Sequence, residues 1–185
     1  MSQLELLSLL VKVLNDLQID HMLVGSYASS YYGEARSTHD VDLVIHIEPA
    51  KIPEFVASFA PDRYYISEAA LREGRMANLI DTHTGDKMDC FLLDDDPYNR
   101  QAFSRRTLRN ILGIYIPLAS AEDTVLAKLK WSELGGGLPQ QLDDARAILR
   151  HQRDRLDMTY LAEQAKALGL SRWLTNLLKE TDDAS

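Results

Sequence analysis

Apolar residues near the start of the chain recur with helical spacing. Leucines and valines fall every three or four positions between Leu4 and Leu17, which predicts an amphipathic helix over about residues 3 to 18. A short apolar run from Met22 to Val24 follows and ends at Gly25-Ser26. Residues 27 to 32 could then form a short helix. This part of the chain therefore predicts a helix, a strand, a Gly-Ser turn and a second helix.

Residues from Asp40 to Ile47 alternate between apolar and polar in the pattern of a strand. Because side chains two positions apart on a strand point to the same face, Asp40 and Asp42 should project together, away from the core. Two neighbouring carboxylates repel each other unless a positive charge lies between them. The alternation thus indicates a metal site.

The middle of the chain predicts a helix over residues 49 to 59 and strands around residues 64 to 66, 76 to 80 and 87 to 93. Asp89 stands inside the last of these apolar runs. A charged side chain is rarely buried without a partner, so we also expect a cation next to Asp89.

The pattern changes from strands to helices after Leu118, with helices expected at about residues 120 to 134, 140 to 151, 158 to 168 and 171 to 180. We therefore expect an α/β (α+β) fold. A core over residues 1–118, a mixed sheet with flanking helices and an N-terminal helix, should precede a helical C-terminal region over residues 119–185. Trp131 and Trp173 are expected to anchor the core.

Composition narrows the class of protein. The chain has 185 residues, of which 45% are hydrophobic and 26% charged, as in an ordinary globular protein. The sole cysteine, Cys90, lies in a predicted strand and should be a core residue. No leader or long apolar run is present, so we expect a cytoplasmic protein without a membrane partner. A net charge of −8 argues against non-specific coating of nucleic acid.

Several of these segments resemble the DNA polymerase beta-like nucleotidyltransferase superfamily. They are Val24-Gly25-Ser26, the run from Arg36 to Ile45, and Lys87-Met88-Asp89. Further segments look like its bacterial abortive-infection toxin-type (AbiEii-like) branch, which includes toxins of toxin–antitoxin pairs: Phe91-Leu92-Leu93, Arg105-Arg106, the run from Glu122 to Trp131, and Asp144. That branch often has two glycines where this chain has Val24-Gly25.

The resemblance implies a nucleotidyltransferase core that moves a nucleoside monophosphate from a nucleoside triphosphate to a hydroxyl. Such a transfer must neutralise charge on the attacking and leaving oxygens, which two magnesium ions can do. Asp40 and Asp42 would supply the shared ligands. Asp89 would bind the ion beside the acceptor hydroxyl and could assist its deprotonation.

The triphosphate should lie at Gly25 and Ser26, because glycine lets the backbone approach a phosphate and a helix N-terminus favours anions. By resemblance, Lys128 could contact the phosphates, and Asp144 could support that lysine or the nucleotide. Lys128 could instead be an exposed helix residue. Arg36 could contact the triphosphate or lie in solvent in a loop.

Other chemistries fit less well. The three glycines from Gly135 to Gly137 are not followed by the Lys-Ser or Lys-Thr of a P-loop, and the histidines lack zinc spacing. His39 could touch substrate or be a loop residue.

Several alternatives stay open. The acceptor could be RNA such as a tRNA 3′ end, a protein side chain, or a small molecule such as an antibiotic. The chain could also be a non-catalytic member that binds a nucleotide or a protein. A cognate antitoxin or toxin partner is implied only by the resemblance.

Overall fold

The computed structural model describes residues 2–38 and 40–183, so His39 lies outside the described residues. Contacts divide the chain into two compact units. The first contains residues 1–26 and 38–118, and the second contains residues 27–37 and 119–185. The contacts therefore group residues 27–37 with the C-terminal helices, whereas the sequence-based division at residues 118 and 119 stays a prediction.

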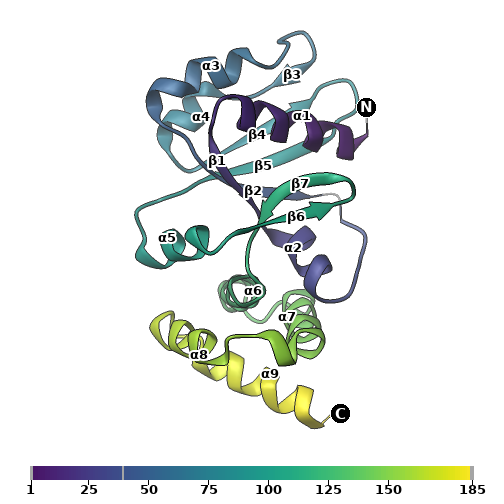
Figure 1. Cartoon of the computed structure of the whole chain (residues 1–185), viewed down its shortest axis with the longest axis vertical. Coiled ribbons are helices and arrows are strands. Elements are labelled where there is room, and N and C mark those ends of the chain that lie inside the picture. The colour runs from purple at the N-terminus through teal and green to yellow at the C-terminus, as the bar shows by residue number, and fades with distance from the viewer. Residues whose placement is uncertain (1, 39, 184–185) are drawn as a thin grey trace. The chain divides into compact units, whose positions relative to one another are not determined.

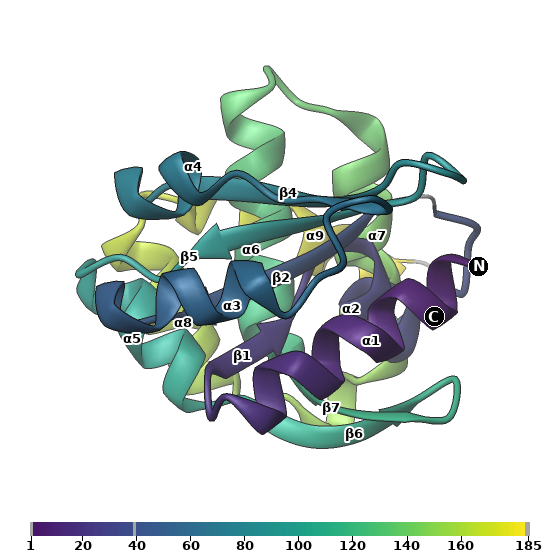
Figure 2. The same cartoon turned by 90° about the horizontal axis from the view of Figure 1, so that it is seen from above.

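The first unit is built on a mixed sheet. Within the described residues, one seven-stranded sheet has the order β3-β4-β5-β2-β1-β7-β6 (Figures 1 and 2). Its strands are β1 (Asp20–Leu23), β2 (Val41–His46), β3 (Tyr64–Tyr65), β4 (Met76–Asp81), β5 (Lys87–Leu92), β6 (Thr107–Ile111) and β7 (Ile114–Leu118). β2 runs parallel to β5, and β1 runs parallel to β7. The other neighbours are antiparallel. The predicted α/β class with a mixed sheet is confirmed.

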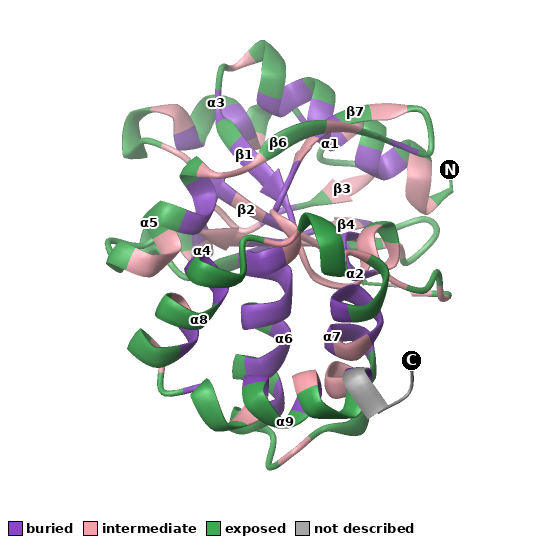
Figure 3. Ribbon diagram, turned by 60° about the horizontal axis from the view of Figure 1, so that its bottom comes forward, coloured by how far each residue is buried: buried purple, intermediate pink, exposed green. Residues whose placement is uncertain are grey.

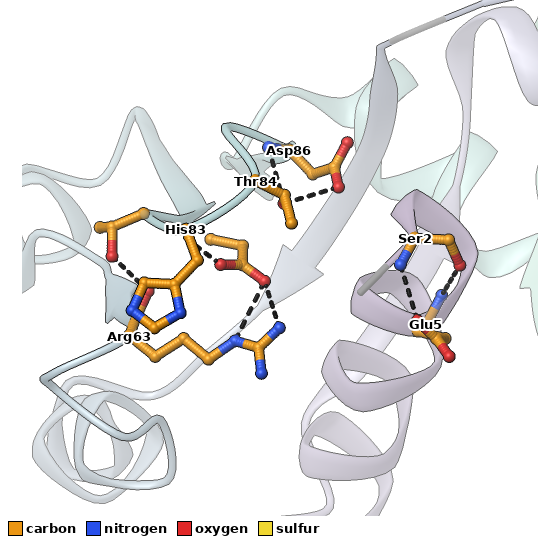
Figure 4. Close-up of polar contacts among 8 residues, drawn as sticks. Ser2, Glu5, Arg63, His83, Thr84 and Asp86 are labelled. Carbon is orange, nitrogen blue, oxygen red and sulfur yellow. Dashed lines mark hydrogen bonds and ion pairs between the residues drawn. The ribbon is translucent and has the colours of Figure 1, made fainter.

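Helix α1 (Gln3–Asp16) follows the predicted apolar spacing and buries one leucine-rich face. A capping box fixes its start: the Ser2 N–H donates to Glu5 Oε2 at 2.6 Å, and the Glu5 N–H donates to Ser2 Oγ at 3.4 Å (Figure 4). Each bond satisfies a backbone donor that the helix itself leaves unpaired. The helix contacts β1 and β5, so it covers part of one face of the sheet.

The remaining helices of the first unit are short: η1 (Pro49–Lys51), α3 (Ile52–Ala57), α4 (Glu68–Glu73) and α5 (Pro97–Ser104). The sequence analysis missed α4 and α5. Caps mark them rather than a long apolar stripe: Ser67 accepts from the Ala70 N–H, and Asp96 accepts from the N–H groups of Tyr98 and Asn99. Helices of this length offer too few turns for hydrophobic periodicity to identify them.

An ion pair joins Arg63, directly before β3, to Asp81 at the end of β4. Asp81 is fully buried, and its Oδ2 accepts from Arg63 Nε at 3.1 Å and from a terminal guanidinium nitrogen at 2.8 Å. The His83 N–H donates to the other oxygen at 2.9 Å, next to the turn that Thr84 and Asp86 stabilise (Figure 4). The hydrogen bond from Arg63 lowers the pKa of Asp81, so this carboxylate is charged and satisfied.

Helix α2 (Gly25–Tyr32) begins in the first unit and ends in the second. The second unit continues with α6 (Ala121–Leu134), α7 (Pro139–His151), η2 (Arg153–Arg155), α8 (Met158–Ala167) and α9 (Ser171–Asp183), which confirms the helical C-terminal region. Helix α6 packs on α7 and α8, and Figure 3 shows its buried stripe in purple. A Cβ at Gly33 would lie 3.0 Å from the Ala147 Cβ, so this glycine lets the chain pass close to α7.

Trp131 does not anchor the core, contrary to the prediction. It is 58% exposed. The buried stripe of α6 passes through Val125, Leu129 and Ser132, and a residue at position 131 lies off that stripe at 100° per residue. Trp173 is half-buried. Cys90 is fully buried in β5, as predicted, and burial raises the pKa of its thiol to about 12. Among the described helices, none has the length and apolarity needed to cross a bilayer.

His21 on β1 should make stability depend on pH. Its ring is buried, its Nδ1 lies 3.0 Å from the Ile19 carbonyl, and its Nε2 has no hydrogen-bond partner among the described residues. Burial, and then the nearby Arg106, lower the pKa of His21 from its usual 6.5. The unfolded chain therefore binds the proton more readily, and the free energy of unfolding should fall as the pH drops below about 6.5.

Urea denaturation across this pH range measures the effect. His21→Phe removes the titrating group and should flatten the pH dependence relative to the unmodified chain. Identical pH profiles for the two proteins would show that His21 does not titrate in this way.

Candidate functional site

The turn between β1 and α2 lies directly against β2. Gly25 has φ +64°, and a Cβ built on it would lie 2.1 Å from Asp42 Oδ2, 2.9 Å from Cγ and 3.1 Å from Cβ. The Val24 N–H also donates to the Asp42 carbonyl at 2.9 Å. Position 25 therefore requires a glycine for two reasons: its backbone has a positive φ, and it lies close to the Asp42 side chain. Ser26 follows in the first turn of α2, where backbone N–H groups lack partners within the helix and favour anions.

Asp42 and Asp89 lie side by side on neighbouring strands. The parallel ladder of β2 and β5 pairs Asp42 with Asp89 in register. Residues in register on adjacent strands point to the same face of the sheet, so the two carboxylates share a face. The Asp89 side chain is only 13% exposed, and Asp42 is of intermediate exposure. The parity predicted for β2 holds, because Val41, Leu43 and Ile45 are fully buried on the opposite face.

Asp40 lies just before β2 rather than within it. The strand begins at Val41, and the Asp40 N–H donates to Thr38 Oγ1 at 3.2 Å. Its side chain is 62% exposed. The strand predicted from residue 40 is therefore one residue too long at its start, because a local turn takes the hydrogen bond that a strand neighbour would otherwise supply.

Lys87 and Asn78 hold the Asp89 carboxylate, and the sequence analysis gave neither of them a role at the site. Lys87 Nζ lies 3.0 Å from Asp89 Oδ2 and 3.4 Å from Asp40 Oδ1. Asn78 Nδ2 donates to Asp89 Oδ1, from the position on β4 paired with Asp89. The hydrogen bond to Asp89, followed by that to Asp40, raises the pKa of Lys87. Lys87 could have been identified from the sequence, because the alternation of β5 puts it on the same face as Asp89.

The acidic residues suit a metal ion that takes few protein ligands. Within residues 2–38 and 40–183, no three histidine, cysteine or acidic side chains are already gathered around one metal position. Asp42 and Asp89 nevertheless offer hard oxygens on one face, and the ammonium of Lys87 lies where a cation interacts with Asp40 and Asp89. Magnesium usually completes its shell with water and substrate phosphates, so the donor set fits that ion.

The second unit contains a buried charge cluster centred on Asp144. Arg36 donates to both carboxylate oxygens, each at 3.0 Å, and Lys128 Nζ lies 2.7 Å from Oδ2. Ser29 Oγ also donates to Oδ2, at 3.2 Å. Lys128 is 4% exposed, so the alternative of an exposed helix residue is wrong. Arg36 is an ion-pair partner rather than a loop arginine in solvent.

Burial of Asp144 would by itself raise its pKa, but the hydrogen bonds from Arg36 and Lys128 outweigh it and the pKa is lowered. In the cluster of Arg36, Lys128 and Asp144, one buried carboxylate binds two cations. These residues belong to the second unit, whereas Gly25, Ser26 and the three aspartates belong to the first. That the two groups meet around one substrate stays a prediction.

Gly25→Ala should destabilise the chain more than an alanine at a glycine without a close neighbour. Gly74 has φ +74° with nothing within 4 Å of its Cβ position, so Gly74→Ala carries only the backbone strain, about 1 to 2 kcal/mol. We expect Gly25→Ala to cost about 2 to 4 kcal/mol, because Asp42 must also move. Chemical denaturation of both variants measures the difference. Equal losses would contradict the close approach of Gly25 to Asp42.

Asp144→Asn should lower the free energy of unfolding by about 3 kcal/mol, because it leaves the buried Lys128 without its counter-charge. Asp143→Asn is the matched control. Asp143 pairs with Arg146 but its side chain is 68% exposed, so its loss should cost less than about 1 kcal/mol. Thermal and urea melts at neutral pH compare them, and a similar small effect for both variants would count against a buried ion pair at Asp144.

Comparison with known proteins identifies the fold. No family model matches the chain, and no curated protein matches it. Among solved structures, an antigenic nucleotidyltransferase-like protein from Paracoccidioides brasiliensis is 20% identical, with a TM-score of 0.58 over 95% of this chain and 91% of that one. The structure of ANT(2″)-Ia with adenylyl-2″-tobramycin is 14% identical, with a TM-score of 0.60 over 94% and 99% of the two chains.

The lincomycin-bound lincosamide antibiotic adenylyltransferase LnuA is 11% identical, with a TM-score of 0.50 over 75% of this chain and 92% of that one. At these identities the likeness establishes the fold alone, and the abortive-infection branch stays a prediction. The chain has an α/β nucleotidyltransferase-like fold.

Proposed function

We propose that this chain is a metal-dependent nucleotidyltransferase that moves a nucleoside monophosphate from a nucleoside triphosphate to a hydroxyl acceptor. One observation carries the proposal. Asp42 and Asp89 are paired in register on adjacent strands, and the backbone of Gly25 lies against Asp42 at the start of a helix. This arrangement combines hard metal ligands with a place where a phosphate can approach the backbone.

Asp40, Asp42 and Asp89 would hold magnesium. When bound, two such ions neutralise the charge on the attacking and leaving oxygens of the transfer. Asp89 is oriented by Lys87 and Asn78, so its carboxylate is held in place before any substrate arrives. Asp89 would also be suited to accept the proton of the acceptor hydroxyl. The more exposed Asp40 is freer to adjust to its ligand.

Gly25 and Ser26 would bind the triphosphate. Glycine presents no side chain between the backbone and a phosphate, and Ser26 adds a hydroxyl at the helix N-terminus. Lys128 and Arg36 would supply positive charge to the phosphates from the second unit. Asp144 binds both cations and so would act as a positioning residue for them. Cationic side chains of this kind suit an anionic substrate.

The acceptor is a separate question, and fold alone does not decide it. The resemblance to the abortive-infection branch favours RNA such as a tRNA 3′ end, together with a role in a toxin–antitoxin pair. The likeness to ANT(2″)-Ia, which spans nearly all of both chains, favours a hydroxyl of a small molecule such as an antibiotic. A non-catalytic role is less well supported, because a nucleotide- or protein-binding member has no need to keep three site carboxylates.

Asp42→Asn and Asp89→Asn should each lower label transfer by about 100-fold or more, because each removes an anionic oxygen that a hard cation prefers. Asp95 is 98% exposed, so Asp95→Asn should keep full activity. The assay combines the protein, magnesium and each labelled triphosphate with total RNA, protein or an aminoglycoside, and follows which species gains label.

Melting curves without metal complete the test. Asp42→Asn and Asp89→Asn should melt within a few degrees of the unmodified chain, since the contacts that each carboxylate loses are offset by the removal of repulsion between neighbouring carboxylates. Full transfer by either variant would exclude the proposed metal site. Absence of transfer by the unmodified chain to every acceptor would favour a non-catalytic alternative, a nucleotide-binding one if a triphosphate still binds and a protein-binding one if none does.

A further inference from the structure

Lys87 occupies a position at the carboxylates that the proposed reaction does not require. It is the first residue of β5, two positions before Asp89, and therefore lies on the same face of the sheet. Its ammonium is 3.0 Å from Asp89 and 3.4 Å from Asp40. The side chain is 45% exposed, so it can leave this position without opening the core.

The neighbouring carboxylates need a cation whenever no metal is bound. Asp42 and Asp89 are in register, and the exposed Asp40 shares the ammonium of Lys87 with Asp89. Like charges at this spacing oppose each other, and an opposite charge within a few ångströms offsets the repulsion. The lysine thus supplies in the metal-free chain part of the neutralisation that magnesium would supply in the loaded one.

We propose that Lys87 is a built-in counter-ion that competes with metal for Asp40 and Asp89 and so sets the metal affinity of the site. This inference rests on the proposed function. Lys87 acts here as a positioning residue, because it holds the carboxylates and need not touch the reacting atoms. Its flexible stem lets the ammonium withdraw when a divalent ion takes over the same oxygens.

The consequence is selectivity for metal that arrives with its triphosphate. An interaction that stabilises only the metal-free state weakens metal binding by the same free energy. Free metal must displace Lys87 with few new ligands in return. Metal bound to a triphosphate gains the contacts of the phosphates as well, so it displaces the lysine more readily.

The test measures Mn²⁺ binding to the full chain by electron paramagnetic resonance, without nucleotide. Lys87→Met removes the charge but keeps an unbranched side chain, and it should bind Mn²⁺ roughly three- to tenfold more tightly. Lys87→Gln should change the affinity in the same direction, whereas Lys87→Arg keeps the charge and should stay near the original affinity. Lys12→Met is the matched control, because Lys12 is an exposed lysine paired with Asp16 on α1, and it should bind Mn²⁺ unchanged.

Thermal melts give a second readout. Lys87→Met should melt at a lower temperature than the unmodified chain without metal and should gain more from saturating Mn²⁺. Unchanged or weaker Mn²⁺ binding by Lys87→Met and Lys87→Gln, with binding lost in Asp89→Asn, would overturn the inference and leave the proposed function intact. No Mn²⁺ binding by any variant, with or without triphosphate, would overturn the metal assignment and this inference together.

Discussion

The parallel pairing of β2 with β5 is the constraint on which the rest of the candidate site depends. It sets Asp42 beside Asp89 on one face of the sheet, an arrangement of like charges that is unfavourable by itself. Three features of the surrounding structure respond to it. Gly25 leaves room for the Asp42 carboxylate, Asn78 donates to Asp89, and Lys87 contributes a positive charge. Gly25, Asn78 and Lys87 therefore each help to accommodate these carboxylates.

Each of the two compact units carries a cluster of paired charges. In the first unit, Lys87 lies beside Asp40 and Asp89, and Asp42 is in register with Asp89. In the second, Lys128 and Arg36 surround Asp144. Each cluster retains a counter-charge of its own, since buried or crowded charges are costly when they are left unpaired.

The likeness to an antibiotic adenylyltransferase, to ANT(2″)-Ia and to a nucleotidyltransferase-like protein from Paracoccidioides brasiliensis concerns the fold alone. Nucleotidyl transfer makes similar demands at the metal and the phosphates whichever hydroxyl attacks. The surfaces that select an acceptor are free to differ between proteins of one fold. Trp131 on α6 is an example of such a surface residue, because its side chain is exposed although its apolar character alone would suggest burial.

The sequence by itself determined the elements whose signal is local. Apolar spacing predicted α1, the major strands and the C-terminal helices, and alternation predicted the shared face of Asp42 with the other polar positions of β2. Short capped helices such as α4 and α5 escaped this reading, because caps involve few residues and leave little periodicity. Only the tertiary structure decided that Lys87 bridges Asp40 and Asp89, and that Arg36 binds Asp144 across 108 positions of the chain. Contacts of this kind depend on how distant segments pack, and local periodicity carries no information about that packing.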